Sequence, residues 1–164
     1  MPLRFLLTCT LLSLLLACTP APSPFPPNSP EAALAELLQT EGVLHIVGKK
    51  PSANGVLLFF TAEPSGFNAL QQPRQLRIGN AYLEEQKGEW VVLLSITNSP
   101  INPETMPDRA FTHGVSTATS PKGHEILVLQ GDVVDKRVFW IEVRLVNGEV
   151  VRLQPIEGMF AYTT

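Results

Sequence analysis

Three histidines and several acids are the residues of this chain best suited to bind a metal ion. They are His45, His113 and His124, with Glu125, Asp132 and Asp135 close to the last two in sequence. Zinc sites mostly use tight spacings such as H-x-x-x-H, because neighbouring ligands must converge on one ion. The first two histidines are 68 positions apart and the next two are 11 apart. The spacing predicts no metal or other cofactor, and we expect Asp135 to cap a turn.

Serines and paired carboxylates could support hydrolysis. None of the serines expected in strands or turns, Ser95, Ser116 and Ser120, lies in a G-x-S-x-G motif. Glu84 and Glu85 are adjacent, and adjacent strand residues point to opposite faces, so they cannot flank one glycosidic bond. We expect both carboxylates to be solvated. The sequence therefore predicts no catalytic residues and a protein that is not an enzyme.

Three aromatic residues are candidates for binding a protein, a peptide or a sugar. Tyr82 and Trp90 lie on the two arms of one expected hairpin, and Trp140 is expected to share a face with Glu142 and Arg144. An exposed aromatic side chain on a sheet often anchors a partner. The alternative is that each ring is buried or covered by a neighbouring loop, and we favour that interpretation.

The amino-terminal segment has the pattern of an export signal. Arg4 precedes Phe5–Leu16, a run of twelve residues without charge. As a helix this run would be about 18 Å long, well short of the roughly 30 Å hydrocarbon core of a bilayer. The pattern predicts the core of a signal peptide rather than a membrane span.

The leader ends in Leu15-Leu16-Ala17-Cys18, which resembles the lipobox of bacterial lipoproteins. The resemblance implies that residues 1–17 are a signal peptide and that Cys18 carries diacylglycerol and a further fatty acyl chain such as palmitate. The protein would then be held by lipid on the extracytoplasmic face of the cell membrane. Cys9 is a rival in outline, but only four residues of apolar core would precede it. An ordinary signal ending at Ala21 is disfavoured because prolines flank that position.

The composition separates a stalk from a folded domain. Residues 18–30 contain the lipidated cysteine and a stretch with six prolines, which favours an extended stalk. At about 3.1 Å per residue that stalk would span roughly 35 Å. Residues 31–164 are expected to form one domain, because 45% of the chain is hydrophobic and only 16% is charged. The net charge is −3 and no basic run is present, so we expect no nucleic-acid partner.

Ser29-Pro30-Glu31 is typical of a helix start, with a hydroxyl cap, proline at the first position and an acid near the positive dipole end. Leu34, Leu37 and Leu38 follow with the spacing of one helix face. Gly42 is placed to end the helix.

After Gly42 the pattern changes to short apolar segments separated by turn residues. This predicts a mainly β fold, in which the N-terminal helix is followed by an antiparallel β-sandwich. The expected strands are 43–48, 55–62, 75–85, 89–97, 110–119, 125–134, 137–146, 149–154 and 158–163. The loop 98–109 contains three prolines and is the longest irregular stretch of the domain, so we expect function there first.

The Asn147-Gly148 turn allows the register of one hairpin to be predicted. A two-residue loop would pair Val143 with Arg152, whereas a three-residue loop, 146–148, pairs Val143 with Val151. The second register also sets Glu142 against Arg152, so it is favoured and requires a left-handed Gly148 in a bulge. The side chains then expected to face the core are Phe139, Ile141, Val143 and Leu145. Those expected on the other face are Trp140, Glu142 and Arg144.

The segment from Gly131-Asp-Val-Val-Asp135 to Asn147-Gly148 resembles a motif of uncharacterised secreted bacterial lipoproteins. Upstream, Val43-Leu44-His45 and Gly55–Phe60 are similar to the same proteins. The resemblance implies a β-sandwich and no known activity. We therefore expect a lipid-anchored domain that binds or senses an unknown ligand without catalysis. Two alternatives stay open: an accessory subunit of an envelope complex, and a hydrolase of envelope material.

Overall fold

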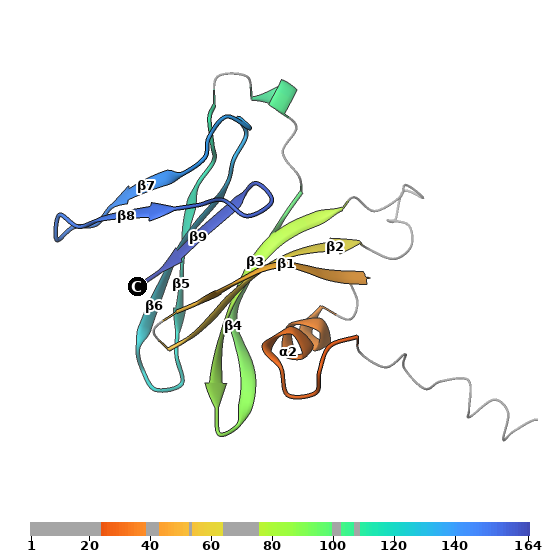
Figure 1. Ribbon diagram of the computed structural model, residues 1–164. Coiled ribbons are helices and arrows are strands. Elements are labelled where there is room, and N and C mark those ends of the chain that lie inside the picture. The colour runs from red at the N-terminus through yellow and green to blue at the C-terminus, as the bar shows by residue number, and fades with distance from the viewer. Residues whose placement is uncertain (1–23, 39–42, 53, 64–75, 100–102, 107–108) are drawn as a thin grey trace, which may run out of the picture.

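One α-helix, one short 3-10 helix and nine strands form the fold, which a computed structural model describes for residues 24–38, 43–52, 54–63, 76–99, 103–106 and 109–164 (Figure 1). The predicted mainly β class is confirmed. Each expected strand overlaps an observed one, but 110–119 is a strand only from Gly114 onward and 137–146 only over Ile141–Arg144. The elements are α2 (Pro30–Leu37), β1 (Val43–Pro51), β2 (Gly55–Glu63), β3 (Arg77–Gln86), β4 (Glu89–Asn98), the 3-10 helix η2 (Pro103–Thr105), β5 (Gly114–Thr119), β6 (Glu125–Asp132), β7 (Ile141–Arg144), β8 (Val150–Leu153) and β9 (Met159–Thr163).

The strands form three antiparallel sheets. Strands β1, β2, β3 and β4 make a four-stranded sheet in chain order, β5, β6 and β9 make a three-stranded sheet with β6 in the middle, and β7 pairs with β8. Figure 1 shows α2 beside the four-stranded sheet and the β7–β8 hairpin on the far side of the three-stranded sheet. The buried clusters agree with this order of layers: helix, four strands, three strands, two strands.

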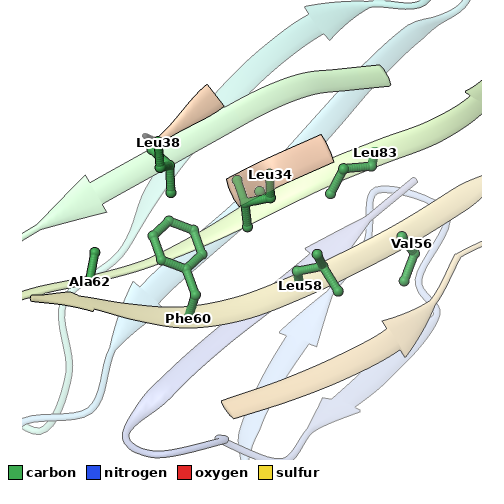
Figure 2. Close-up of a cluster of buried hydrophobic side chains, with 8 residues drawn as sticks. Leu34, Leu38, Val56, Leu58, Phe60, Ala62 and Leu83 are labelled. Carbon is green, nitrogen blue, oxygen red and sulfur yellow. The ribbon is translucent and has the colours of Figure 1, made fainter. Parts of the chain in front are cut away.

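Strand β2 is buried on both faces and forms the centre of the structure. Leu58 and Phe60 lie in one buried cluster with Leu34 of the helix and with Leu38, which directly follows the helix (Figure 2). Phe59 points the other way, into a cluster shared with the three-stranded sheet. Because side chains alternate along a strand, a strand covered on both sides must be apolar throughout, which explains the run Gly55–Phe60.

The helix begins as predicted. The backbone N–H of Ala32 donates to Ser29 Oγ at 3.1 Å, and Pro30 occupies the first turn. Of the three leucines with the spacing of one helix face, Leu34 and Leu38 are buried and Leu37 is 56% exposed. The sheet contacts only a narrow stripe of this short helix. The helix ends at Leu37, and Gly42 lies outside the described residues.

The β7–β8 hairpin has the predicted register. Val143 pairs with Val151 and Glu142 with Arg152, and the φ angle of Gly148 is +86°. Leu145 closes the loop, since its carbonyl accepts from the Gly148 N–H at 3.0 Å and its N–H donates to the Glu149 carbonyl at 2.8 Å. These two bonds define the predicted three-residue loop with a bulge.

The face assignment of this hairpin is right except at its beginning. Ile141 is buried, and Val143 and Leu145 are half-buried. Trp140, Glu142 and Arg144 are exposed, as predicted. Phe139 was expected in the core and is 74% exposed, because β7 begins only at Ile141 and the strand alternation does not extend back to it. None of the helices in the described segments is long and apolar enough to cross a membrane.

Candidate ligand-binding cleft

The inward-facing side chains of β6 change from apolar to polar toward the end of the strand. Ile126 and Val128 belong to the cluster between the two larger sheets. Gln130 and Asp132 follow at spacings of two and are also buried, with exposed fractions of 8% and 7%. Strand alternation therefore brings an amide and a carboxyl group to one end of the space between the sheets.

Asp132 lines two hollows at this end of the sandwich. The larger has a volume of about 710 Å³, and the smaller one of about 430 Å³. Apolar side chains of the larger hollow include Ile78, Val138 and Phe139, and Gln130 lines the smaller one. Both volumes fall in the range of roughly 300 to 1,000 Å³ that is usual for small-molecule sites. We call the two hollows together the Asp132 cleft.

Charge is scarce around the Asp132 carboxylate. Asn98 Nδ2 donates to Asp132 Oδ2 at 3.4 Å, a contact that joins the four-stranded and three-stranded sheets. Within the described segments no lysine or arginine forms an ion pair with Asp132. Burial raises the pKa of Asp132, and the hydrogen bond from Asn98 opposes that rise. The two ionised side chains on the wall of the larger hollow, Lys136 and Glu157, are both exposed.

Gln130 adds an unsatisfied acceptor to the smaller hollow. Its side-chain oxygen Oε1 is buried and has no hydrogen-bond partner among the described residues. A buried polar atom without a partner costs about 1 to 3 kcal/mol of stability, so such atoms in native proteins need a reason. This oxygen has almost no solvent-accessible surface, so a ligand in the hollow would reach it only after neighbouring side chains move.

A second buried polar group, the Glu84 carboxylate, differs because each of its two oxygens accepts a hydrogen bond. The carboxylate is 3% exposed and accepts from the Tyr82 hydroxyl and from Ser120 Oγ, each at 3.0 Å. The backbone N–H of Lys122 donates to Ser120 Oγ at 3.2 Å. Burial, together with the Glu84 carboxylate, raises the pKa of Tyr82 to about 12. These bonds connect β3 to the β5–β6 turn, which makes Glu84 a structural link between the sheets.

The buried position of Glu84 corrects the expectation that both adjacent carboxylates are solvated. Glu85 is exposed and Glu84 is not, so the two do point to opposite faces as predicted. Strand β3 lies in the interior of its sheet and is covered on both sides, a position that a pattern of two adjacent acids does not reveal. The other two candidate serines, Ser95 and Ser116, are half-buried, and in the described segments neither forms a hydrogen bond with Glu84.

The candidate metal ligands are dispersed. His45, His113 and His124 are all exposed, and in the described part of the chain no three histidine, cysteine or acidic side chains group as metal ligands. Asp135 caps a turn as predicted, because its Oδ1 accepts from the Arg137 N–H at 2.9 Å. The Arg137 guanidinium also pairs with this carboxylate at 2.7 Å and lowers the pKa of Asp135 to about 2.

The three aromatic candidates have different surroundings. Tyr82 is buried and Trp90 packs half-buried against the helix-side cluster, as the favoured interpretation predicted. Trp140 is 59% exposed, contrary to that interpretation, and the Arg152 guanidinium lies 5.7 Å from the centre of its ring. Arg152 is held there by a 2.9 Å ion pair with Glu142.

Part of the loop predicted to carry function does border the cleft. Asn98 and Ser99 line the smaller hollow, and η2 follows at Pro103–Thr105. Residues 100–102 and 107–108 of this loop lie outside the described residues, as do the leader and Cys18.

Comparison with models of protein families, with curated proteins and with solved structures finds no significant match for this chain.

Sequence reasoning named Asp132 only as a possible cation ligand and did not identify Gln130. The alternation of Ile126, Val128, Gln130 and Asp132 indicates their burial, because it places both polar residues on the core side of a strand. Nothing in the sequence links this strand end to Phe139, which reaches the same hollow from the segment before β7.

Proposed function

We propose that this chain is an exported lipoprotein, anchored by lipid on Cys18, whose β-sandwich domain binds a small ligand in the Asp132 cleft without chemically changing it. The observation that carries the binding role is the pair Gln130 and Asp132. Both are more than nine-tenths buried, both line hollows, and Gln130 Oε1 lacks a partner in the described structure.

The absence of catalysis is proposed from the chemistry of the cleft wall. Asp132 has Asn98 as its hydrogen-bond partner. Ser99 and His113 line the smaller hollow with Asp132, but in the described segments no hydrogen bond joins the Ser99 hydroxyl to His113 or His113 to Asp132. A hydrolase needs a nucleophile or an activated water between positioned acid and base groups. The groups of this cleft suit recognition, because they accept hydrogen bonds beside an apolar wall.

The anchoring part rests on the sequence alone. Leu15-Leu16-Ala17-Cys18 follows an apolar run too short to span a bilayer, and a proline-rich stretch separates the cysteine from the first helix. Such a stalk would hold the cleft away from the membrane surface, where a ligand could reach it from the surrounding medium.

Binding can be tested by native mass spectrometry of the mature chain, residues 18–164 with Cys18→Ser, after incubation with a small-molecule extract of the cell envelope. We expect the wild-type domain to retain one ligand and Phe139→Ala to lose it, because this substitution removes an exposed aromatic ring that lines the cleft. Trp140→Ala is the matched control, because this neighbouring exposed ring does not line the cleft. Equal retention in both variants, or no retention in any, would contradict the proposal.

Anchoring can be tested by fractionating cells that express the full chain. Cys18→Ser should abolish lipid labelling and remove the protein from the detergent-soluble membrane fraction, or leave it uncleaved. Cys9→Ser should change neither property. Lipid labelling that survives in Cys18→Ser would refute the assignment.

A further inference from the structure

The larger hollow of the cleft combines a buried carboxylate, that of Asp132, with an apolar wall. Gln130 lies two residues before Asp132 on the same face of β6 and lines only the smaller hollow. The wall includes Ile78 and Val138, with the exposed ring of Phe139 at the rim. A ligand that satisfies both parts must carry several hydrogen-bond donors on one small group and an apolar body behind it.

A primary ammonium group meets the first requirement best. It carries three donors and no acceptor, and its positive charge balances a carboxylate that has no basic partner in the described segments. A hydroxyl has only one donor and no charge, so it would leave the Asp132 carboxylate without a counter-charge. A carboxylate on the ligand would be repelled by Asp132.

The other charges at the cleft do not reverse this preference. Lys136 and Glu157, both exposed, lie on the wall of the larger hollow and offset one another, which leaves the charge of Asp132 as the net contribution. His113 lines the smaller hollow, but it is exposed, and its ring packs at 6.1 Å from that of Phe111.

We propose that the Asp132 cleft binds an organic primary amine, with the ammonium group at the Asp132 carboxylate and the apolar body against Val138 and Phe139 in the larger hollow. This inference rests on the proposed binding function and specifies its ligand class. The anchoring of the chain plays no part in it.

The test uses three probes of the same length, n-hexylammonium, hexan-1-ol and hexanoate. Each is titrated into the mature chain while the backbone amide NMR signals of residues 130–139 are followed. We expect hexylammonium to bind at least about tenfold more tightly than hexanol, because a charged hydrogen bond in a partly buried site is stronger than a neutral one. Hexanoate should not bind measurably.

Two single-charge variants separate a specific site from general attraction. Asp132→Asn preserves the shape of the side chain and should reduce hexylammonium affinity to the level of hexanol. Glu125→Gln removes an exposed carboxylate from the same strand, at a position that lines neither hollow, and should leave the affinity within about twofold, since exposed charges interact weakly through water. Amide spectra of both unliganded variants should match the wild type outside the cleft, which shows that any loss of affinity does not come from unfolding.

The results separate a failure of the proposed ligand class from a failure of the proposed binding function. Equal affinity for the three probes, or an equal effect of the two variants, would overturn the amine proposal. If the envelope extract still gave a ligand sensitive to Phe139→Ala, the binding function would nevertheless stand. If the extract gave no such ligand, the binding function would fail as well.

Discussion

Gly148 offers the sharpest test of how the β7–β8 hairpin is built and therefore of where Phe139 and Trp140 are held. Its φ angle is +86°, and a Cβ atom added there would meet no atom within 4 Å. The cost of a side chain at this position must then come from backbone conformation alone. For an L-residue in the left-handed region that cost is about 1 to 2 kcal/mol, and β-branched residues are at the upper end or above it.

We expect Gly148→Ala to lower the free energy of unfolding by about 1 kcal/mol and Gly148→Val by about 2 kcal/mol. For a domain of this size about 1 kcal/mol corresponds to a Tm lower by roughly 4 °C. Gly114→Ala is the matched control, because its Cβ also meets nothing within 4 Å and its φ angle is not in the left-handed range. That substitution should be neutral or stabilise by up to about 1 kcal/mol, since glycine loses the most backbone entropy on folding.

Urea unfolding of Gly148→Ala, Gly148→Val, Gly114→Ala and Asn147→Ala would distinguish the three-residue loop from a two-residue turn. Asn147 Oδ1 accepts from the Glu149 N–H at 3.0 Å on the surface, so its loss should cost only about 0.5 kcal/mol. A loss at Asn147→Ala equal to that at Gly148→Ala would indicate positive φ at both positions, as in a two-residue type I′ turn. The register and the exposure of Trp140 would then be wrong.

Three further substitutions test the buried polar groups by equilibrium unfolding. Glu84→Ala should destabilise by about 2 to 4 kcal/mol, because it leaves the Tyr82 and Ser120 hydroxyls without their acceptor; a change below about 1 kcal/mol would refute the link between the sheets. Gln130→Leu should be neutral or stabilise the domain by up to about 1 kcal/mol, since it removes an acceptor that has no partner in the described structure. Clear destabilisation by this substitution would show that the Gln130 oxygen is already paired. Because the pKa of Asp132 is raised in the folded state, its proton favours folding in acid and that contribution is lost as the pH rises through the raised pKa. Asp132→Asn should thus gain stability relative to the wild type between pH 3 and pH 8, and a difference that does not change with pH would contradict the burial of an ionisable carboxyl group.

The elements of this fold were predictable because their causes are local. Ser29 and Pro30 specify the helix start by capping, and the apolar alternation with turn residues marks each strand. The hairpin register followed from pairing Val143 with Val151 across a turn that only glycine fits well. Each of these signals lies within a few residues of the feature that it specifies.

The errors arose where burial depends on distant layers. Glu84 is buried because the helix and the three-stranded sheet cover opposite faces of the sheet that contains β3. The residues next to Glu84 in sequence do not indicate this coverage. Leu37 is exposed although it has the spacing of the buried leucines, and Phe139 is exposed because β7 begins only at Ile141. The cleft itself brings together Ile78, Asp132 and Phe139 from separate parts of the chain, so the sequence could supply its polar residues but not its shape.

The most direct test of the central claim is to locate the bound ligand on the protein. The mature chain with Cys18→Ser, labelled for amide NMR, would be mixed with the ligand recovered from the envelope extract. We predict that the shifted signals cluster at Gln130, Asp132 and residues 136–139, with one site saturated and the ligand recovered unchanged in mass. Shifts confined to the outer hairpin face at Trp140, Glu142 and Arg152, or a ligand returned with altered mass, would contradict a non-catalytic binding cleft at Asp132.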